Sequence, residues 1–338
     1  MYRNSEFVYD AVAQLENRIA FPVKVSSARK GHDAILTIKD MQFTVTAKAE
    51  IRTANKGLVL AQLKELESKS KRPIMIIAKF IASDIALEFK EKSINYLDVA
   101  GNTYIKEGDF FIYITGQKTL KASKTNQTRA FQEAGIRLIF NLLTRPEPLQ
   151  RSYRELAEET GIAIGSISHV MRELEDLKFI LKTESKRVLK NKSGLLDRWI
   201  VAYQDVLRPR LVKRQLRFAD KSKYSNWKKI DLNPLKAKNT LWGGEPAAAI
   251  LTNHLKPAFY TIYTTKSWQE CAKSFGLIPD ENGDVEIVQM FWTSIQPKEN
   301  DLAIVPPALV YADLINSGND RNLETAQIIF DNELQHLK

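Results

Sequence analysis

The chain has 338 residues, of which 44% are hydrophobic and 27% are charged, and its formal net charge is +10. This is the composition of a globular protein with room for two or three domains. Its single cysteine, Cys271, excludes an intrachain disulfide, and no apolar run reaches the ~20 residues that a membrane helix needs. We therefore expect a cytoplasmic protein that does not span a membrane.

The positive charge is concentrated in one part of the chain. Residues 182–229 carry fifteen basic and four acidic side chains, whereas residues 230–338 carry eight basic and fourteen acidic ones. A local cationic excess of this size is typical of contact with a polyanion such as nucleic acid. The acidic C-terminal part is not expected to bind nucleic acid by itself.

The first 118 residues predict an α/β domain. Helical spacing at 6–20 is followed by strand-like segments at 23–26, 34–39 and 42–51, a helix at 56–68 and an apolar strand at 74–79. A short helix at 84–92 and strands at 95–99, 103–106 and 110–115 complete the domain. The initial order, αβββαβ, is similar to the core of the restriction-endonuclease-like superfamily.

That similarity raises the question of a nuclease site. Such enzymes hold Mg²⁺ with an Asp and an E-x-K pair, and here Asp33 and Glu16 are the nearest candidates. The strand at 43–52 offers Thr46-Ala47-Lys48 or Glu50-Ile51-Arg52, and neither is E-x-K. We therefore expect no catalytic residue, no metal and no cofactor, with a Mg²⁺-dependent DNA nuclease as the alternative.

A turn at Ala100-Gly101-Asn102 separates two strands of this domain. Asp98 and Asn102 could converge there, either to hold a hairpin or to form a polar site at the strand end. The polar segment 117–127, which lacks apolar periodicity, is predicted to be a linker.

Residues 126–192 predict a winged helix-turn-helix. A helix at 131–143 precedes Ser152, which with Glu155 has the spacing of a capping box, and Gly161 follows the helix at 153–160. A second helix at 164–177 and two strands at 179–183 and 187–190, joined by Glu184-Ser185-Lys186, complete the pattern. The alternative is an ordinary helical hairpin inside a globular domain.

The predicted DNA-binding residues are small, hydrogen-bonding or basic groups on the exposed side of these elements. Ser166, Ser168, His169 and Arg172 are expected to read bases, because such side chains let a helix approach base edges. Cations of the first helix and the wing are expected to hold phosphate. The full predicted set is Ser152, Tyr153, Arg154, Ile164, Gly165, Ser166, Ser168, His169, Arg172, Lys182, Lys186, Arg187 and Lys190.

Residues 193–338 predict a basic connecting helix, at 195–206, and a C-terminal α/β domain. Cations at 208–229 alternate with Phe218, Tyr224 and Trp227, which favours phosphate contact beside the wing; stacking on single strands or a solvated face are the alternatives. At 241–251 a Gly-Gly turn leads into a small-residue helix, predicted to be a packing turn rather than a nucleotidyltransferase site. Residues 301–314 predict a strand, a Pro-Pro turn and a helix, and 322–336 a terminal helix.

Several motifs together resemble the AbiEi-type antitoxins, transcriptional regulators of type IV toxin–antitoxin systems. The motifs are 94–102 (INYLDVAGN), 131–135 (FQEAG), the helix-turn-helix, 242–248 (WGGEPAA), Pro306-Pro307 and 322–326 (NLETA). The resemblance implies operator binding by the winged helix and repression of the protein's own promoter. It also implies opposition to a nucleotidyltransferase-like toxin, without requiring that the two proteins bind each other.

The sequence thus predicts an α+β multidomain protein that binds double-stranded operator DNA. Because one winged helix reads few base pairs, we expect homodimers or paired operator sites. The rival hypotheses are the Mg²⁺-dependent nuclease and a regulator whose C-terminal domain senses a small molecule.

Overall fold

The computed structural model of the chain describes residues 6–19, 21–27, 33–117, 128–145, 147–184, 186–232, 239–293 and 303–338. It divides into two compact units, Met1–Asn126 and Gln127–Lys338. The described part is α+β with three separate sheets, which confirms the predicted fold class at that level. The division of the second unit at residue 192 stays a prediction.

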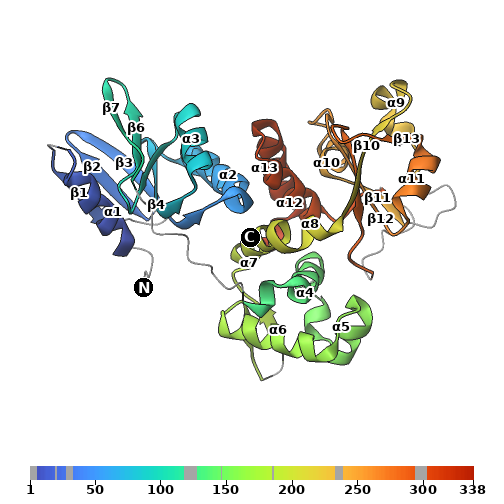
Figure 1. Cartoon of the computed structure of the whole chain (residues 1–338). Coiled ribbons are helices and arrows are strands. Elements are labelled where there is room, and N and C mark those ends of the chain that lie inside the picture. Colours follow the sequence, from blue (N-terminus) through green and yellow to red (C-terminus); the bar gives the residue numbers. More distant parts are fainter. Residues whose placement is uncertain are drawn as a thin grey trace. The chain divides into compact units, whose positions relative to one another are not determined.

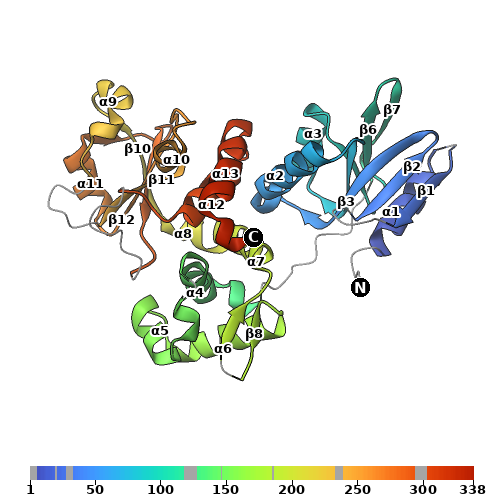
Figure 2. The same cartoon turned by 180° about the vertical axis from the view of Figure 1, so that it is seen from behind.

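The first unit is built on a seven-stranded sheet whose spatial order equals its chain order (Figures 1 and 2). Neighbouring strands are antiparallel except for the β3–β4 and β4–β5 pairs, which are parallel. The strands are β1 (Val23–Ser27), β2 (Ala34–Ile38), β3 (Met41–Ile51), β4 (Ile74–Ile81), β5 (Asn95–Asp98), β6 (Thr103–Glu107) and β7 (Phe110–Ile114).

Helices cover both faces of this sheet. The helix α1 (Glu6–Glu16) buries Val8, Ala11 and Leu15 against alternate residues of the strands, including Met75 and Ile77. The helices α2 (Thr53–Lys69) and α3 (Ser83–Glu91) make the parallel crossovers and pack on the opposite face. The order αβββαβαβββ is the one that the periodicity predicted. Of the predicted linker at 117–127, residues 118–127 lie outside the described residues.

The second unit begins with a small helical lobe that ends in a two-stranded ribbon. It contains η1 (Arg129–Phe131), α4 (Glu133–Thr144), η2 (Glu147–Gln150), α5 (Tyr153–Thr160), α6 (Ile164–Asp176), β8 (Ile180–Lys182) and β9 (Arg187–Leu189). The helix α4 is the centre of this lobe, because Ile136, Leu138, Ile139 and Leu143 are fully buried. The strand β8 packs beside α6 (Figure 2).

A helical connection leads from the ribbon into the C-terminal lobe. It consists of α7 (Lys192–Ala202), a π-helical turn (Tyr203–Leu207) and α8 (Arg208–Leu211), where a single helix at 195–206 was expected. Trp199 stacks between Phe140 of α4 and Tyr203, at ring-centroid distances of 5.4 and 5.2 Å. The Trp199 Nε1–H also donates to the Ile136 carbonyl at 2.9 Å. The helical lobe is therefore anchored to the C-terminal lobe through a buried aromatic stack.

The C-terminal lobe is a five-stranded sheet in the order β11-β12-β14-β10-β13, in which only β12 and β14 are parallel. The strands are β10 (Val212–Phe218), β11 (Thr240–Gly243), β12 (Tyr260–Thr264), β13 (Leu277–Pro279) and β14 (Val285–Gln289). The helices α10 (Gly244–Thr252), α12 (Pro307–Ser317) and α13 (Asp320–Glu333) pack on one another. The shorter segments are α9 (Ser222–Ser225), η4 (Trp227–Lys229), α11 (Trp268–Phe275) and η5 (Gln335–Leu337).

Two expectations for this lobe need correction. The predicted strand before Pro306 is reduced, among the described residues, to a bridge between Ile304 and Trp242. The expected Pro-Pro turn is shorter than predicted, because α12 begins directly at Pro307. Proline is tolerated there, since the N–H groups in the first turn of a helix have no acceptor within the helix.

Candidate nucleic-acid interface

The turn between α5 and α6 is formed by the local signals that the sequence carries. The Ser152 Oγ accepts the Glu155 N–H at 3.3 Å, and the Glu155 carboxylate accepts the Ser152 N–H at 2.7 Å, so the predicted capping box is confirmed. Hydrogen bonds from the side chain and the backbone of Ser152 to the carboxylate lower the pKa of Glu155. Gly161 has φ 67°, the left-handed conformation that ends α5.

The helix α6 has one buried and one exposed side. Ile167, Val170, Met171 and Leu174 are buried, as their spacing predicted. Its N-cap, Ala163, has no side chain that can accept a hydrogen bond, so the N–H groups of the first turn carry no side-chain cap. Such N–H groups are suited to an anionic group supplied from outside.

Most of the predicted DNA-binding residues are solvent-exposed. Ile164 is 48% exposed although it is apolar. Tyr153, Ser166, Ser168 and Arg187 are half-buried. The exposed members of the set are Ser152, Arg154, Ile164, Gly165, His169, Arg172, Lys182, Lys186 and Lys190.

The ribbon β8–β9 is closed by Thr183 and Lys186. The Thr183 N–H donates to the Lys186 carbonyl at 2.8 Å, and the Thr183 Oγ1 accepts the Lys186 N–H at 3.1 Å. Leu181, which the sequence did not single out, is 51% exposed on β8. The only sequence signal for it is an apolar residue directly before the predicted phosphate ligand Lys182, on the predicted strand at 179–183. The expected tip includes Ser185, which lies outside the described residues.

Arg187 differs from the other predicted phosphate ligands. Its guanidinium donates to the carbonyls of Leu149 and Arg151, at 3.2 and 3.3 Å, and lies 5.0 Å from the centroid of the Tyr153 ring. Two residues of the predicted set, Tyr153 and Arg187, are therefore in contact with each other. Gln150, which the sequence did not single out, binds the backbone of Arg187.

Four cations of the basic segment at 208–229 have partners elsewhere in the second unit. Arg208 binds Glu286 at 2.6 Å, Arg210 binds Glu133 at 3.1 Å and Arg217 binds Asp280 at 3.2 Å. The Lys223 Nζ donates to the Phe275 carbonyl at 2.6 Å, at the end of α11. These four cations therefore have partners within the protein, and the expected phosphate contact beside the wing stays a prediction.

The aromatic residues of the same segment form part of a core. Phe218 is 1% and Trp227 6% exposed, and both rings lie within 7 Å of Tyr260. Tyr224 donates its hydroxyl to Asp284 at 2.6 Å. Their interleaving with cations reflects packing beneath a charged surface, and the described geometry leaves no ring stack open to bases.

A buried polar cluster lies where α8 meets the C-terminal sheet. The Tyr203 and Tyr263 hydroxyls are 2.8 Å apart, and the Tyr263 O–H donates to Asp313 at 3.0 Å. Burial raises the pKa of Asp313 to about 6, although Arg208 and Tyr263 oppose this. Burial lowers the pKa of Arg208, but Asp313 and Glu286 raise it by more. Tyr203, Tyr263 and the Asp313 side chain are buried, and the cluster holds the half-buried Arg208 as a cation.

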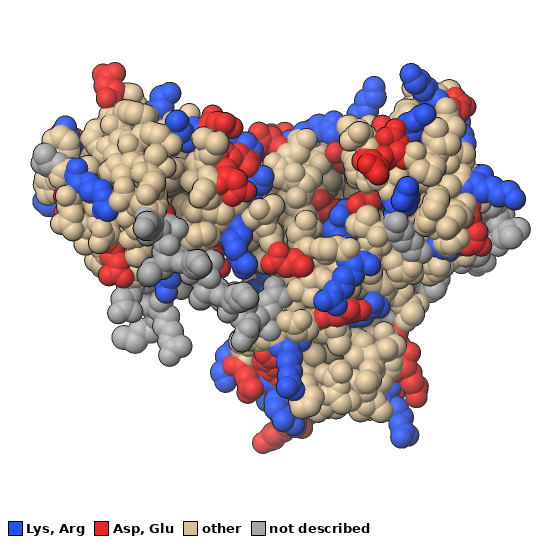
Figure 3. Space-filling view, viewed as in Figure 1, with Lys and Arg blue, Asp and Glu red and all other residues tan. Residues whose placement is uncertain are grey.

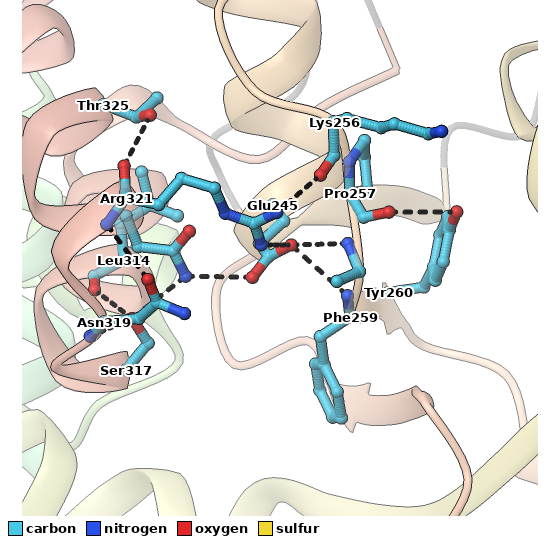
Figure 4. A network of polar contacts seen from close by, with 12 residues as sticks. Glu245, Lys256, Pro257, Phe259, Tyr260, Leu314, Ser317, Asn319, Arg321 and Thr325 are labelled. Carbon is cyan, nitrogen blue, oxygen red and sulfur yellow. Dashed lines mark hydrogen bonds and ion pairs between the residues drawn. The ribbon is translucent and has the colours of Figure 1, made fainter.

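The Gly-Gly turn before α10 is a packing turn, as expected. A Cβ on Gly243 would lie 2.4 Å from the ring of Tyr263. After the turn, the Glu245 carboxylate accepts the N–H groups of Ala258 and Phe259, at 2.7 and 3.3 Å. It also accepts donors from α13, Arg321 at 2.9 Å and Asn322 at 3.0 Å (Figure 4). Glu245 therefore fastens α10 to both the 256–259 loop and α13.

The carboxylates considered for a nuclease site have partners in the first unit. The Asp33 Oδ2 accepts the Ala47 N–H at 2.7 Å, and the Glu16 Oε1 accepts the Val23 N–H at 2.8 Å. Glu50 pairs with Arg52 at 3.3 Å. Among the described residues, no group of three or more His, Cys, Asp or Glu side chains is placed to hold a metal ion.

Asp98 and Asn102 do converge at their turn. The Asp98 carboxylate accepts the Asn102 N–H and its side-chain amide, both at 2.8 Å, and Asn102 also exchanges hydrogen bonds with Gln117. Burial raises the pKa of Asp98, and the hydrogen bonds from Asn102 oppose this. These contacts support the hairpin alternative, because both side chains bind the turn itself.

Comparison with known proteins identifies the C-terminal part of the chain. No curated protein and no solved structure matches the chain, so the likeness of the first unit to endonucleases stays a prediction. No helix in the described ranges is long and apolar enough to cross a membrane. Residues 187–335 match the family model described as "Transcriptional regulator, AbiEi antitoxin, Type IV TA system". Over these residues the chain is similar to the AbiEi antitoxin family of transcriptional regulators, the family whose resemblance was inferred from the sequence.

Proposed function

We propose that this protein is a sequence-specific DNA-binding regulator that represses its own promoter, and that α4–α6 with β8–β9 form its winged helix. In this proposal α6 enters the major groove. Ser166, Ser168, His169 and Arg172 face base edges, and Lys182, Lys186 and Lys190 hold phosphates.

The observation that carries the proposal is the chemistry of the exposed side of α6. Gly165 has no side chain, and no heavy atom lies within 4 Å of the position that its Cβ would take. Ser168, His169 and Arg172 follow at helical spacing, so the helix presents short or hydrogen-bonding groups along one line. A surface of this kind suits close approach to base edges.

Charge alone does not select this lobe as a DNA-binding surface. In Figure 3 the lobe that carries α4–α6 shows Lys and Arg side by side with Asp and Glu. A small number of exposed lysines on the ribbon therefore has to supply the phosphate contacts. We expect a modest salt dependence, with a slope that reflects these few contacts.

The test is binding of the full-length protein to a labelled duplex from its own promoter, measured against a scrambled duplex. His169→Ala or Arg172→Ala should weaken promoter binding by about 1–3 kcal/mol and leave binding to the scrambled duplex unchanged. Lys186→Ala should weaken both equally and lower the salt slope by about one. Equal affinity of the wild type for both duplexes would refute sequence-specific reading.

The family assignment supports an antitoxin role. We propose that the protein opposes a nucleotidyltransferase-like toxin, without a stable complex between them, and that it binds DNA as a homodimer or at paired sites. Co-expression tests the first part: growth arrest caused by the toxin should be relieved. Sedimentation in the presence of a one-site and a two-site duplex tests the second part.

A further inference from the structure

The ribbon that would touch phosphate is itself small. Each of its strands has three residues, and an isolated two-stranded hairpin is marginally stable in water. A wing of this size can place its lysines on DNA only if another element fixes it. The described contacts of β9 identify that element as η2 and the start of α5.

Gln150 occupies the free edge of β9. Its Nε2 donates to the Arg187 carbonyl at 2.6 Å, and its Oε1 accepts the Arg187 N–H at 3.1 Å. Arg187 is paired with Lys182 across the ribbon, one position inside the hydrogen-bonded Thr183–Lys186 closure. In an antiparallel pair such a residue points its own N–H and C=O away from its partner strand. The Gln150 side chain therefore takes the place of a third strand at this position.

The side chain of Arg187 in turn binds the backbone on both sides of Gln150. Its Nη1 donates to the carbonyls of Leu149 and Arg151, the two neighbours of Gln150, and its guanidinium faces the Tyr153 ring. Tyr153 is the first residue of α5, directly after the capping Ser152. The contact is thus reciprocal, with each side chain bound to the backbone of the other segment. It ties the ribbon to the helix that opens the helix-turn-helix.

We propose that Gln150 and Arg187 form a clamp that fixes the wing against α5, and that both are positioning residues for DNA binding. This inference rests on the proposed function, and it replaces the expectation that Arg187 holds phosphate. Its hydrogen bonds and its aromatic contact are directed into the protein. The adjacent Lys186 is exposed and, among the described contacts of its side chain, carries none that would compete with phosphate.

The first test needs no DNA. In the full-length protein, backbone hydrogen exchange of residues 183–190 is compared among the wild type, Gln150→Ala, Arg187→Lys and Gln269→Ala. Gln269 is an exposed glutamine of α11 and serves as the matched control. Loss of two hydrogen bonds should speed exchange in the ribbon roughly tenfold in both clamp variants and leave the control unchanged. Unchanged exchange in Gln150→Ala would overturn the clamp.

The second test separates positioning from contact. Gln150→Ala changes no charge, and Arg187→Lys keeps the charge but loses the planar fork. Both should weaken promoter binding roughly tenfold with an unchanged salt slope, whereas Lys186→Ala should lower the slope by about one. Full affinity in Arg187→Lys would show that Arg187 acts as a point charge on phosphate, and would overturn the positioning role.

The two tests fail in different ways. If the wild type does not bind its promoter, the proposed function is refuted, while the exchange result still decides whether the clamp exists. If the wild type binds and the clamp variants bind equally well, the proposed function stands and the positioning role is refuted. Circular dichroism melting of each variant shows that the rest of the fold is intact.

Discussion

Glu245 offers the sharpest test of how the C-terminal lobe is held together. Its side chain is 9% exposed, and its carboxylate joins three segments: α10, the 256–259 loop and α13. Glu245→Ala removes the carboxylate, so its four donors, two loop N–H groups and the side chains of Arg321 and Asn322, lose this acceptor. The Asn322 amide keeps one hydrogen bond, to Ser317, but its second N–H loses its acceptor and cannot reach water, because Asn322 is 2% exposed. The Arg321 side chain is 43% exposed and can be rehydrated.

The expected loss follows from that difference in exposure. A buried donor without a partner costs about 1–3 kcal/mol, and each loop N–H that water can reach costs about 0.5–1 kcal/mol. Glu245→Ala should therefore lower the free energy of unfolding by about 3 kcal/mol. The control, Arg321→Ala, should cost at most about 1 kcal/mol, because the Arg321 end of the pair is exposed to solvent and the carboxylate keeps three other donors.

The assay is urea unfolding followed by tryptophan fluorescence. All five tryptophans lie in the second unit, so the signal reports on that unit even in the full-length chain. Glu245→Gln, which keeps one acceptor oxygen, should fall between the wild type and Glu245→Ala. A loss below about 1 kcal/mol in Glu245→Ala, or an equal loss in Arg321→Ala, would refute the role assigned to the carboxylate.

Three further predictions concern other sites. Burial raises the pKa of Asp313 to about 6, above the ~3.9 of an unfolded aspartate, so stability falls as pH rises between these values. Asp313→Asn should remove this fall, and its stability relative to the wild type, measured by urea unfolding, should rise by about 3 kcal/mol from pH 4 to pH 7. Gly243→Ala places a methyl group against the Tyr263 ring and should lower the free energy of unfolding by about 1–3 kcal/mol, seen as a lower melting temperature. Plasmid DNA incubated with the protein and Mg²⁺ should stay intact on a gel; nicking that disappears in Asp33→Ala would establish the nuclease alternative.

The sequence predicted those elements whose signals are local. Ser152, Glu155 and Gly161 lie within ten residues of one another, and each acts on the helix end beside it. The bounds of α5 were therefore predictable, and so was the buried side of α6. The same holds for the turn at Asp98 and Asn102, where the residues that interact are four positions apart.

Long-range partners could not be predicted in this way. The strand β10 has the sequence VKRQLRF, whose cations indicate a solvated stretch when it is considered alone. It is nevertheless an inner strand, because β14 and β13 pair with its two edges. Leu216 and Phe218 are buried, and Arg217 pairs with Asp280, far along the chain. The contacts of Arg187 could not be predicted for the same reason, since its partners at 149–151 precede it by more than thirty residues.

The aromatic stack of Phe140, Trp199 and Tyr203 couples the two lobes of the second unit thermodynamically. It joins the core of the helical lobe to the C-terminal lobe, so a change of packing in one lobe alters the free energy of the other. Suppose that DNA binds more tightly to one arrangement of this stack. A molecule that binds the C-terminal lobe more tightly in one of the arrangements then changes the affinity of the protein for DNA by some factor. Linkage then requires that DNA change the affinity for that molecule by the same factor. The fraction of operator sites bound would then depend on how much of that molecule is bound to the C-terminal lobe, and the reverse would also hold.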